Sequence, residues 1–185
     1  MRASCYMPHE RGFAMLFAVL VSSVLLSIGI SIFNLTIKEL VLSSSGRESQ
    51  FAFYAADTGA ECAIYWDFKG TNIFATSTDP RTPNPSNPSC VDSGGVPQVI
   101  DVTTVNPGGT YGIISQNSNS AETQFTLNIP GSTNCTIVRV KKLTVSGLQT
   151  TRIDARGYNT CDTTDINRVE RGLRVCYGPD CATIN

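Results

Sequence analysis

The sequence contains very little histidine: His9 is the single histidine among 185 residues. The rest of the chain therefore cannot build a Ser-His-Asp or Cys-His catalytic arrangement, or a metal site with histidine ligands. Acidic residues lie close together at Asp162, Asp165 and Glu170, but acidic side chains in a loop are usually solvated. The segment 162–167 also lacks the glycine and the spacing of a calcium loop. We expect no enzyme activity, no metal and no cofactor.

The cysteines lack the CxxC spacing that is typical of zinc sites. Cys5 stands apart near the start of the chain, and the other six form an even set, which is typical of a disulfide framework in an oxidising compartment. Reduced cysteines in a cytosolic core are the alternative. We expect cysteines that are neighbours in the sequence to pair: Cys62 with Cys90, Cys135 with Cys161, and Cys176 with Cys181.

Charged residues and prolines are absent from the segment 13–33, which is apolar almost throughout. As a helix it would be about 30 Å long, enough to cross a bilayer. The preceding Arg2 and Arg11 favour an N-terminus in the cytoplasm and an exported C-terminal part. A cleavable secretory signal would have a shorter apolar core and a small-x-small cleavage site, neither of which is present, whereas a plain signal anchor remains open.

The order Arg11, Gly12, Phe13 at the start of the apolar segment resembles the class III leader of type IV pilins and the related pseudopilins. This resemblance implies that prepilin peptidase removes the leader 1–12 by cutting between Gly12 and Phe13, and methylates the new N-terminus. It also implies that 13–34 is a transmembrane and assembly helix. Its partners would be membrane lipid before assembly, the inner-membrane assembly platform, and then other pilins in an extracellular filament.

Phe17 departs from the pattern of that family, because most pilins carry a glutamate at this position. In the family this glutamate is thought to neutralise the N-terminal amine of a neighbouring subunit, and a buried unpaired charge is costly. A phenylalanine cannot do this. The departure argues against the repeating major subunit and fits minor pilins, some of which lack the glutamate and sit at the filament tip.

The helical pattern continues past the membrane segment, since no proline follows until Pro80. We expect a helix from Phe13 to about Trp66, with 35–68 as its amphipathic continuation. Gly29 and the segment 43–46 contain weak helix formers, so we expect hinges there, unless these small residues pack against a neighbouring helix. The stripe expected to face the core consists of Phe51, Ala55, Thr58, Cys62 and Tyr65.

Prolines and glycines mark 69–97 as a loop too rich in helix and strand breakers for a regular element. Beyond it, 98–185 shows the alternation of a disulfide-bonded antiparallel β domain. The apolar residues change phase across Lys141 and Lys142, which predicts a bulge. The expected strands are 98–105, 111–115, 124–129, 136–145, 150–156 and 168–177.

Together these elements predict an α+β fold, in which a long N-terminal helix packs against an antiparallel β-sheet as in pilins. The motif YAADTGAECA at 54–63 resembles the segment after the anchor in PilX-type minor pilins. The patterns ARGYNTC at 155–161 and RVERGLRVCY at 168–177 resemble the closing strands of the same proteins.

Basic residues in the last three strands are candidates for contact with DNA or another surface ligand. The simpler expectation is a solvated strand face that blocks edge pairing, because the net charge of −1 gives no global field that attracts nucleic acid. The residues are Arg139, Lys141, Lys142, Arg152, Arg156 and Arg174.

The leading hypothesis is a non-enzymatic minor pilin or pseudopilin that primes or caps a filament. The alternative is a signal-anchored surface-binding domain that keeps its leader and never assembles. An exported enzyme that works without histidine is the third and least favoured hypothesis.

Overall fold

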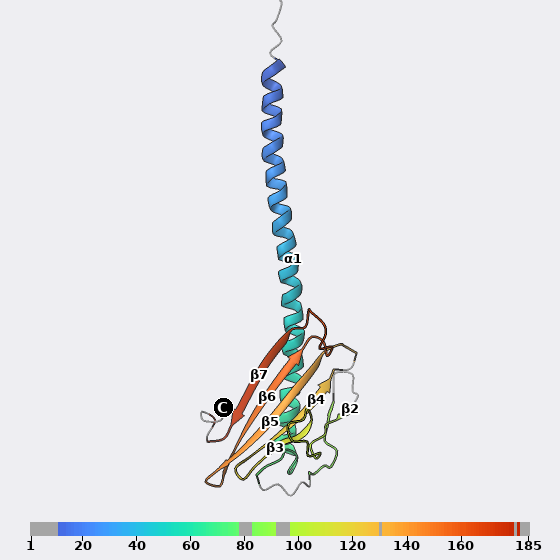
Figure 1. Ribbon diagram of the computed structural model, residues 1–185, viewed down its shortest axis with the longest axis vertical. Coiled ribbons are helices and arrows are strands. Elements are labelled where there is room, and N and C mark those ends of the chain that lie inside the picture. Colours follow the sequence, from blue (N-terminus) through green and yellow to red (C-terminus); the bar gives the residue numbers. More distant parts are fainter. Residues whose placement is uncertain (1–10, 78–82, 92–96, 130, 180, 182–185) are drawn as a thin grey trace, which may run out of the picture. The chain divides into compact units, whose positions relative to one another are not determined.

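The computed structural model describes residues 11–77, 83–91, 97–129, 131–179 and 181, and these form one helix and seven strands (Figure 1). Helix α1 (Arg11–Lys69) has 59 residues. The fold is α+β, as predicted. The chain divides into two compact units, Met1–Ser45 and Gly46–Asn185, and the division falls inside the segment 43–46. Residues 1–10 of the expected leader lie outside the described residues.

The main sheet is an antiparallel meander of five strands in the order β3-β4-β5-β6-β7. Each strand follows its neighbour in the chain, so no connection crosses the sheet. The connection from β6 to β7 is longer and runs from Asn159 to Val169. The tightest connection joins β5 to β6 through Ser146 and Gly147, whose φ angles of 51° and 80° are those of a hairpin turn that favours glycine. The strands are β3 (Gly112–Gln116), β4 (Ser120–Asn128), β5 (Cys135–Val145), β6 (Leu148–Tyr158) and β7 (Glu170–Tyr177).

Two short strands, β1 (Ser89–Val91) and β2 (Pro97–Val99), form a separate antiparallel pair. Strand β1 lies in the segment 69–97, where no regular element was expected. The strand expected at 98–105 ends at Val99, because the Asp101 Oδ1 atom accepts hydrogen bonds from the backbone amides of Thr103 (3.1 Å) and Thr104 (3.0 Å). A side chain that bonds the backbone two and three residues ahead replaces the ladder of a strand with a turn.

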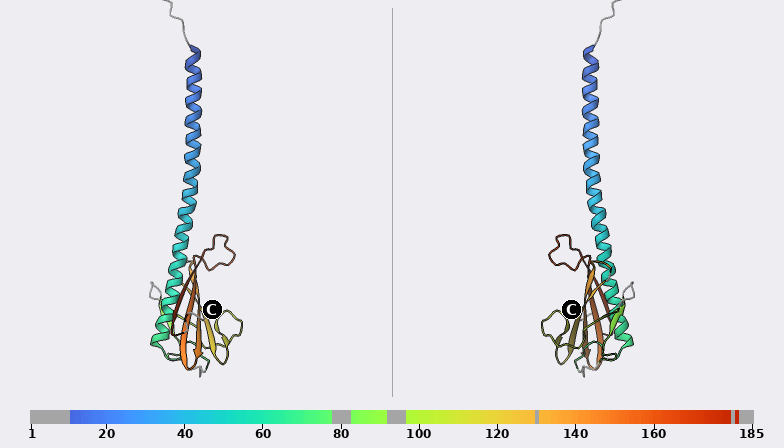
Figure 2. Two further views of the ribbon diagram at one scale, coloured as in Figure 1. Left: turned by 90° about the vertical axis from the view of Figure 1, so that its left-hand side faces the viewer. Right: turned by 90° about the vertical axis from the view of Figure 1, so that its right-hand side faces the viewer.

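The second half of α1 lies against one face of the main sheet (Figures 1 and 2). Small residues make this contact: a methyl group added at Gly157 of β6 would lie 2.0 Å from the Ala52 carbonyl oxygen, and one added at Gly59 would lie 2.6 Å from side-chain atoms of Thr136 and Val138. The helix residues that the contact buries to 1% exposure or less are Ala52, Ala55, Ala56, Ala60 and Ala63.

The core-facing stripe of α1 therefore differs from the predicted one. Ala55 is buried, and Thr58 and Cys62 are partly buried, but Phe51 and Tyr65 are 37% and 54% exposed. The helix backbone comes so close to the sheet that only small side chains fit between them. Large apolar residues come from the sheet instead, among them Phe125, Val138, Val140 and Ile153.

The predicted bulge in β5 is absent. The register of β5 runs without a shift from Ser120↔Leu143 to Asn128↔Cys135 on one side, and it is equally regular against β6. Lys142 therefore continues the inward-facing series of Val138 and Val140 and is 8% exposed. The change of phase in the sequence arises because a lysine occupies an inward position, where an apolar residue was expected.

Candidate functional site

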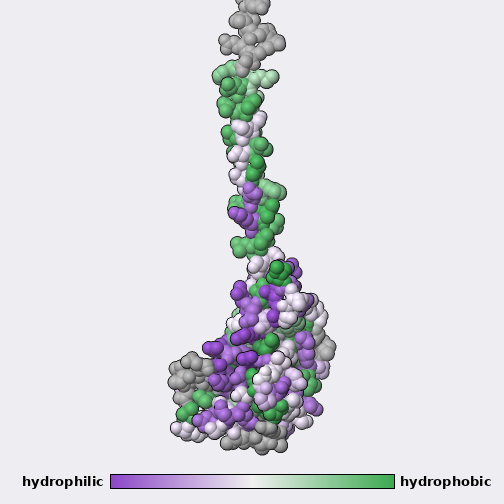
Figure 3. All heavy atoms as spheres, viewed as in Figure 1, coloured by the Kyte–Doolittle hydropathy of each residue, from purple (hydrophilic) through white to green (hydrophobic). Residues whose placement is uncertain are grey.

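Of the first unit, the structure describes the part of α1 that ends at Ser45, and its side chains from Phe13 to Ser45 are exposed. By length and composition, α1 has a stretch near the N-terminus that is apolar enough to cross a membrane, and none of that stretch is buried. Phe13 and Phe17 are both exposed, and green apolar residues predominate here in Figure 3. Hydroxyl groups within the stretch donate to backbone carbonyls, as Ser22 Oγ does to Ala18 O at 2.7 Å. Such bonds satisfy polar groups that lipid cannot.

Gly12, Phe13 and Gly29 all lie within the continuous helix. A methyl group added at Gly29 would meet nothing within 4 Å, so no contact within the chain explains the absence of a side chain there. The hinge at Gly29 stays a prediction.

The second unit begins with a cluster of contacts on the first helical turn after Ser45. The Glu48 Oε2 atom accepts a hydrogen bond from Asn159 Nδ2 (2.9 Å), and Arg171 Nε donates to Ser49 Oγ (2.6 Å). Asn159 also organises the loop before β7, because its Oδ1 accepts a hydrogen bond from the backbone amide of Val169 at 2.7 Å. This turn of α1 is thereby fixed to β7 and to its preceding loop.

A polar network lies where the C-terminal end of α1 meets the sheet. Asp67 Oδ1 forms an ion pair with Lys142 Nζ, and Asp67 Oδ2 accepts hydrogen bonds from Tyr177 Oη and from Thr151 Oγ1, the latter at 3.2 Å. Burial raises the pKa of the Tyr177 phenol, and the hydrogen bond to the Asp67 carboxylate raises it further. The network joins α1 to strands β5, β6 and β7.

Neither Asp67 nor Tyr177 was predicted from the sequence as a site residue. A signal for Asp67 was present, since it follows Ala56, Ala60 and Ala63 at helical spacing. A carboxylate on a stripe of small buried residues requires a cationic or hydrogen-bonding partner, which here is Lys142.

Three cysteine pairs lie at disulfide distance, and they are the same pairs that proximity in the sequence favoured. The Cα–Cα distances are 5.7 Å for Cys62 and Cys90, 5.5 Å for Cys135 and Cys161, and 5.7 Å for Cys176 and Cys181. The first pair joins α1 to β1, the second joins the start of β5 to the loop before β7, and the third closes the segment after β7. Cys5 lies outside the described residues.

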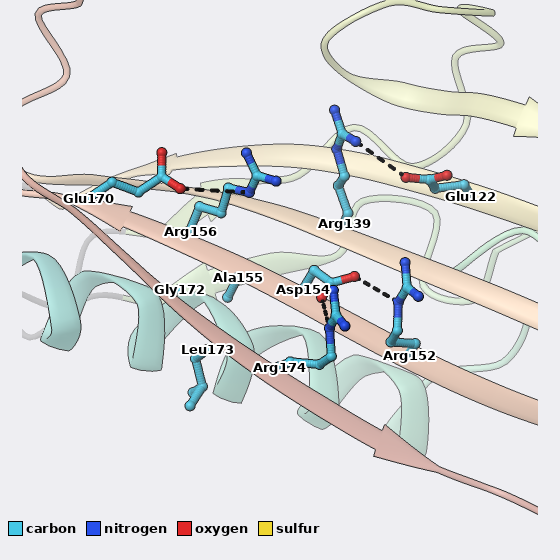
Figure 4. A pocket seen from close by; sticks show the side chains of 10 residues that line it. All are labelled: Glu122, Arg139, Arg152, Asp154, Ala155, Arg156, Glu170, Gly172, Leu173 and Arg174. Carbon is cyan, nitrogen blue, oxygen red and sulfur yellow. Dashed lines mark hydrogen bonds and ion pairs between the residues drawn. The ribbon is translucent and has the colours of Figure 1, made fainter. Parts of the chain in front are cut away.

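The outer face of the main sheet, turned away from α1, carries a shallow groove of about 510 Å³ across β4 to β7 (Figure 4). We call it the arginine groove. Purple hydrophilic residues gather over this part of the domain in Figure 3. Five of the six basic residues noted in the sequence belong to this face of the sheet, and Lys142 belongs to the other. The groove is lined by Glu122, Arg139, Arg152, Asp154, Ala155, Arg156, Glu170, Gly172, Leu173 and Arg174.

Of the three acidic residues that lie close together in the sequence, Asp162 and Asp165 share one loop and Glu170 lies apart from them on β7. Asp162 and Asp165 each accept a hydrogen bond from a backbone amide two residues ahead, at 2.8 Å, whereas Glu170 lies on the outer face of the sheet. Hydrogen bonds from Thr164 lower the pKa of the Asp162 carboxyl. Within the described part of the chain, no three histidine, cysteine or acidic residues are grouped so that they could hold a metal ion.

No family model, curated protein or solved structure matches this chain, so its function is inferred from its own sequence and geometry.

Proposed function

We propose that this chain is a minor pilin or pseudopilin, a structural subunit that primes or caps a type IV pilus-like filament and presents an exposed domain. The observation that carries the proposal is the difference in burial between the two parts of α1. Its apolar first part is not buried by any of the residues that the structure describes, while its second part supplies small residues to the domain core. A long apolar helix with no partner of its own requires lipid or other apolar helices around it.

The order Arg11, Gly12, Phe13 adds the second line of support. Cleavage after Gly12 by prepilin peptidase would leave Phe13 as the first residue of a subunit that begins directly with the apolar helix. Lipid would surround this helix until the inner-membrane assembly platform transfers it to a filament, where the helices of other pilins would replace the lipid. Phe17 supports a minor subunit at the tip, since it has no carboxylate to neutralise the amine of a neighbour.

The N-terminus and the unreduced mass of the protein, measured by mass spectrometry on membranes and on sheared filaments, test the proposal. The expected result is a methylated Phe13 with three disulfides intact. Gly12→Glu should abolish processing, because the residue before the cut is changed. Gly46→Ala is the matched control: a methyl group added at Gly46 meets nothing within 4 Å, and the cleavage site is unchanged.

An intact Met1 in the membrane fraction alone, in a host that has the peptidase, would contradict the proposal. The chain would then be the signal-anchored surface domain that never assembles. Normal processing of Gly12→Glu would show that the leader has been assigned to the wrong residues.

A further inference from the structure

The arginine groove holds four arginines and three carboxylates, and their pairing is unequal. Asp154 lies between two arginines and pairs with both: its Oδ2 is 2.7 Å from Arg152 Nε, and its Oδ1 is 2.5 Å from Arg174 Nε. In Figure 4 its carboxylate is turned toward these two side chains. Asp154 is thus occupied and does not compete for the remaining arginines.

Arg139 and Arg156 are the arginines whose charge is least compensated within the groove. Each has only a long ion-pair contact of 3.8 Å, Arg139 with Glu122 and Arg156 with Glu170, and their side chains are 49% and 58% exposed. Gln124 Oε1 accepts a hydrogen bond from Arg139 Nε at 2.5 Å. This bond holds the Arg139 side chain, and in Figure 4 one terminal nitrogen of its guanidinium group is directed toward Glu122.

The strand register brings these two arginines near one another on the same face of the sheet. Arg139 of β5 is paired with Asp154 of β6, and Arg156 is two residues further along β6 on the same face. Diagonal neighbours of this kind lie roughly 7 to 8 Å apart. Two arginines at that spacing can donate to the two oxygens of a single carboxylate placed between them.

Gly172 keeps the groove open beside Arg156. It is paired with Arg156 across β6 and β7, and a methyl group added to it would meet nothing within 4 Å. The neighbouring Leu173 points toward the opposite face of the sheet in Figure 4. The surface next to Arg156 therefore consists of exposed backbone, which a flat ligand can approach closely.

The composition of the lining favours a sugar over a nucleic acid. With three carboxylates against four arginines, the residues that line the groove carry little net positive charge. Nucleic-acid surfaces are strongly positive. Glu122 and Glu170 can instead accept hydrogen bonds from sugar hydroxyl groups, in addition to the one that Glu170 accepts from Tyr158. Each lies beside an arginine that suits a sugar carboxylate.

We propose that the arginine groove binds an acidic polysaccharide, with Arg139 and Arg156 donating to the carboxylate of one uronic acid residue and with Glu122 and Glu170 accepting from hydroxyl groups on either side of it. The volume of about 510 Å³ lies within the range of small-ligand sites, about 300 to 1,000 Å³. The proposal goes beyond assembly of the chain and does not depend on it.

The test is calorimetric titration of the full chain in detergent micelles with tetramers of galacturonate and of mannuronate. At least one of them should bind saturably, and its methyl ester should bind at least about tenfold more weakly, since a hydrogen bond to a charged group contributes about 1.5 to 3 kcal/mol. Arg139→Gln and Arg156→Gln should each weaken binding by a similar factor. Arg171→Gln is the matched control, because it removes the same charge from β7 on the opposite face and should change the dissociation constant less than twofold.

Circular dichroism of each variant separates a loss of binding from a loss of folding. Gly172→Glu gives a second way to block the groove without removing an arginine, and it should also abolish binding. Three results would overturn the proposal: no saturable binding of either tetramer, equal binding of acid and ester, or an equal loss in Arg171→Gln. Tighter binding of a DNA duplex than of both tetramers at the same salt concentration would overturn it as well and would make nucleic acid the occupant.

Discussion

Asp67 on α1 and Lys142 on β5 form an ion pair inside the domain, with side chains that are 6% and 10% exposed. Tyr177 and Thr151 donate hydrogen bonds to the other oxygen of the same carboxylate. The Asp67 carboxylate therefore joins the end of the long helix to β5, β6 and β7.

Removal of one partner should be far more costly than removal of both. Asp67→Ala leaves the Lys142 ammonium group buried without a counter-charge, and we expect the free energy of unfolding to fall by about 3 to 5 kcal/mol. The double variant Asp67→Leu with Lys142→Met should recover most of this loss, because apolar side chains need no partner. Urea unfolding followed by the fluorescence of Trp66, the single tryptophan, measures both.

Glu61→Ala, on the exposed side of the same helix, is the control and should change the free energy of unfolding by less than about 0.5 kcal/mol. If the double variant were as unstable as Asp67→Ala, the cost would come from packing rather than from the unpaired charge.

Gly157 should tolerate no side chain. A methyl group there meets backbone atoms of α1, the Ala52 carbonyl oxygen at 2.0 Å and the Ala56 nitrogen at 2.3 Å, and backbone cannot move as a flexible side chain does. We expect Gly157→Ala to lower the free energy of unfolding by about 3 kcal/mol, at the upper end of typical overpacking costs.

Gly172→Ala in the adjacent strand is the matched control, because the space around Gly172 is open, and it should be neutral or slightly stabilising. Equal stability of the two variants in the same urea experiment would show that helix and sheet lie further apart than described.

The sequence predicted the long helix and the meander because both depend on local patterns. The alternation of Phe125 and Leu127 and the uncharged segment 13–33 are readable without knowledge of any partner. The core-facing side of α1 was predicted from helical spacing alone, which gave a stripe that includes the exposed Phe51 and Tyr65. The observed side carries Ala52, Ala56 and Gly59 because the sheet comes so close to the helix there. The distance between α1 and the sheet depends on both elements and is not visible in the pattern of either one.

The candidate sites also differ in whether they depend on a local pattern or on two elements that are distant in the sequence. Gly12 and Phe13 are read from a contiguous motif, whereas the unequal pairing of Arg139 and Asp154 depends on the register of β5 and β6. The inward position of Lys142 was misread as a bulge, since a charged residue at a core position is explained only by Asp67, which lies on α1, far away in the sequence.

The three disulfides should contribute unequally to stability. Cys62–Cys90 closes a loop with a sequence separation of 28, whereas the separation for Cys176–Cys181 is 5. By the chain-entropy estimate, a loop of the first size contributes about 3.5 kcal/mol and one of the second size about 2 kcal/mol. We expect the double serine variant of Cys62 and Cys90 to be less stable than that of Cys176 and Cys181 by roughly 1 to 2 kcal/mol.

Denaturation of each double variant without reductant measures this difference, and a mass lower by two hydrogens per disulfide verifies that the other two pairs remain. The opposite ranking would mean that the Cys176–Cys181 pair stabilises the folded state by contacts rather than by loop closure.

Tyr177 should make the domain sensitive to alkaline pH. Its folded-state pKa lies above the ordinary value of 10.0 because the phenol is buried and donates a hydrogen bond to Asp67. Below pH 10 the phenol is protonated in both the folded and the unfolded chain, so its full contribution to stability is present there. Above that pH the unfolded chain releases this proton while the folded chain keeps it, so the free energy of unfolding falls as pH rises toward the folded-state pKa.

Urea unfolding at a series of pH values from about 8 to 12 should therefore show a steeper fall for the parent protein than for Tyr177→Phe, which has no phenol to titrate at this position. Tyr54→Phe, at an exposed position of α1, should keep the parent's slope; if Tyr177→Phe kept it as well, the alkaline sensitivity would arise from another group.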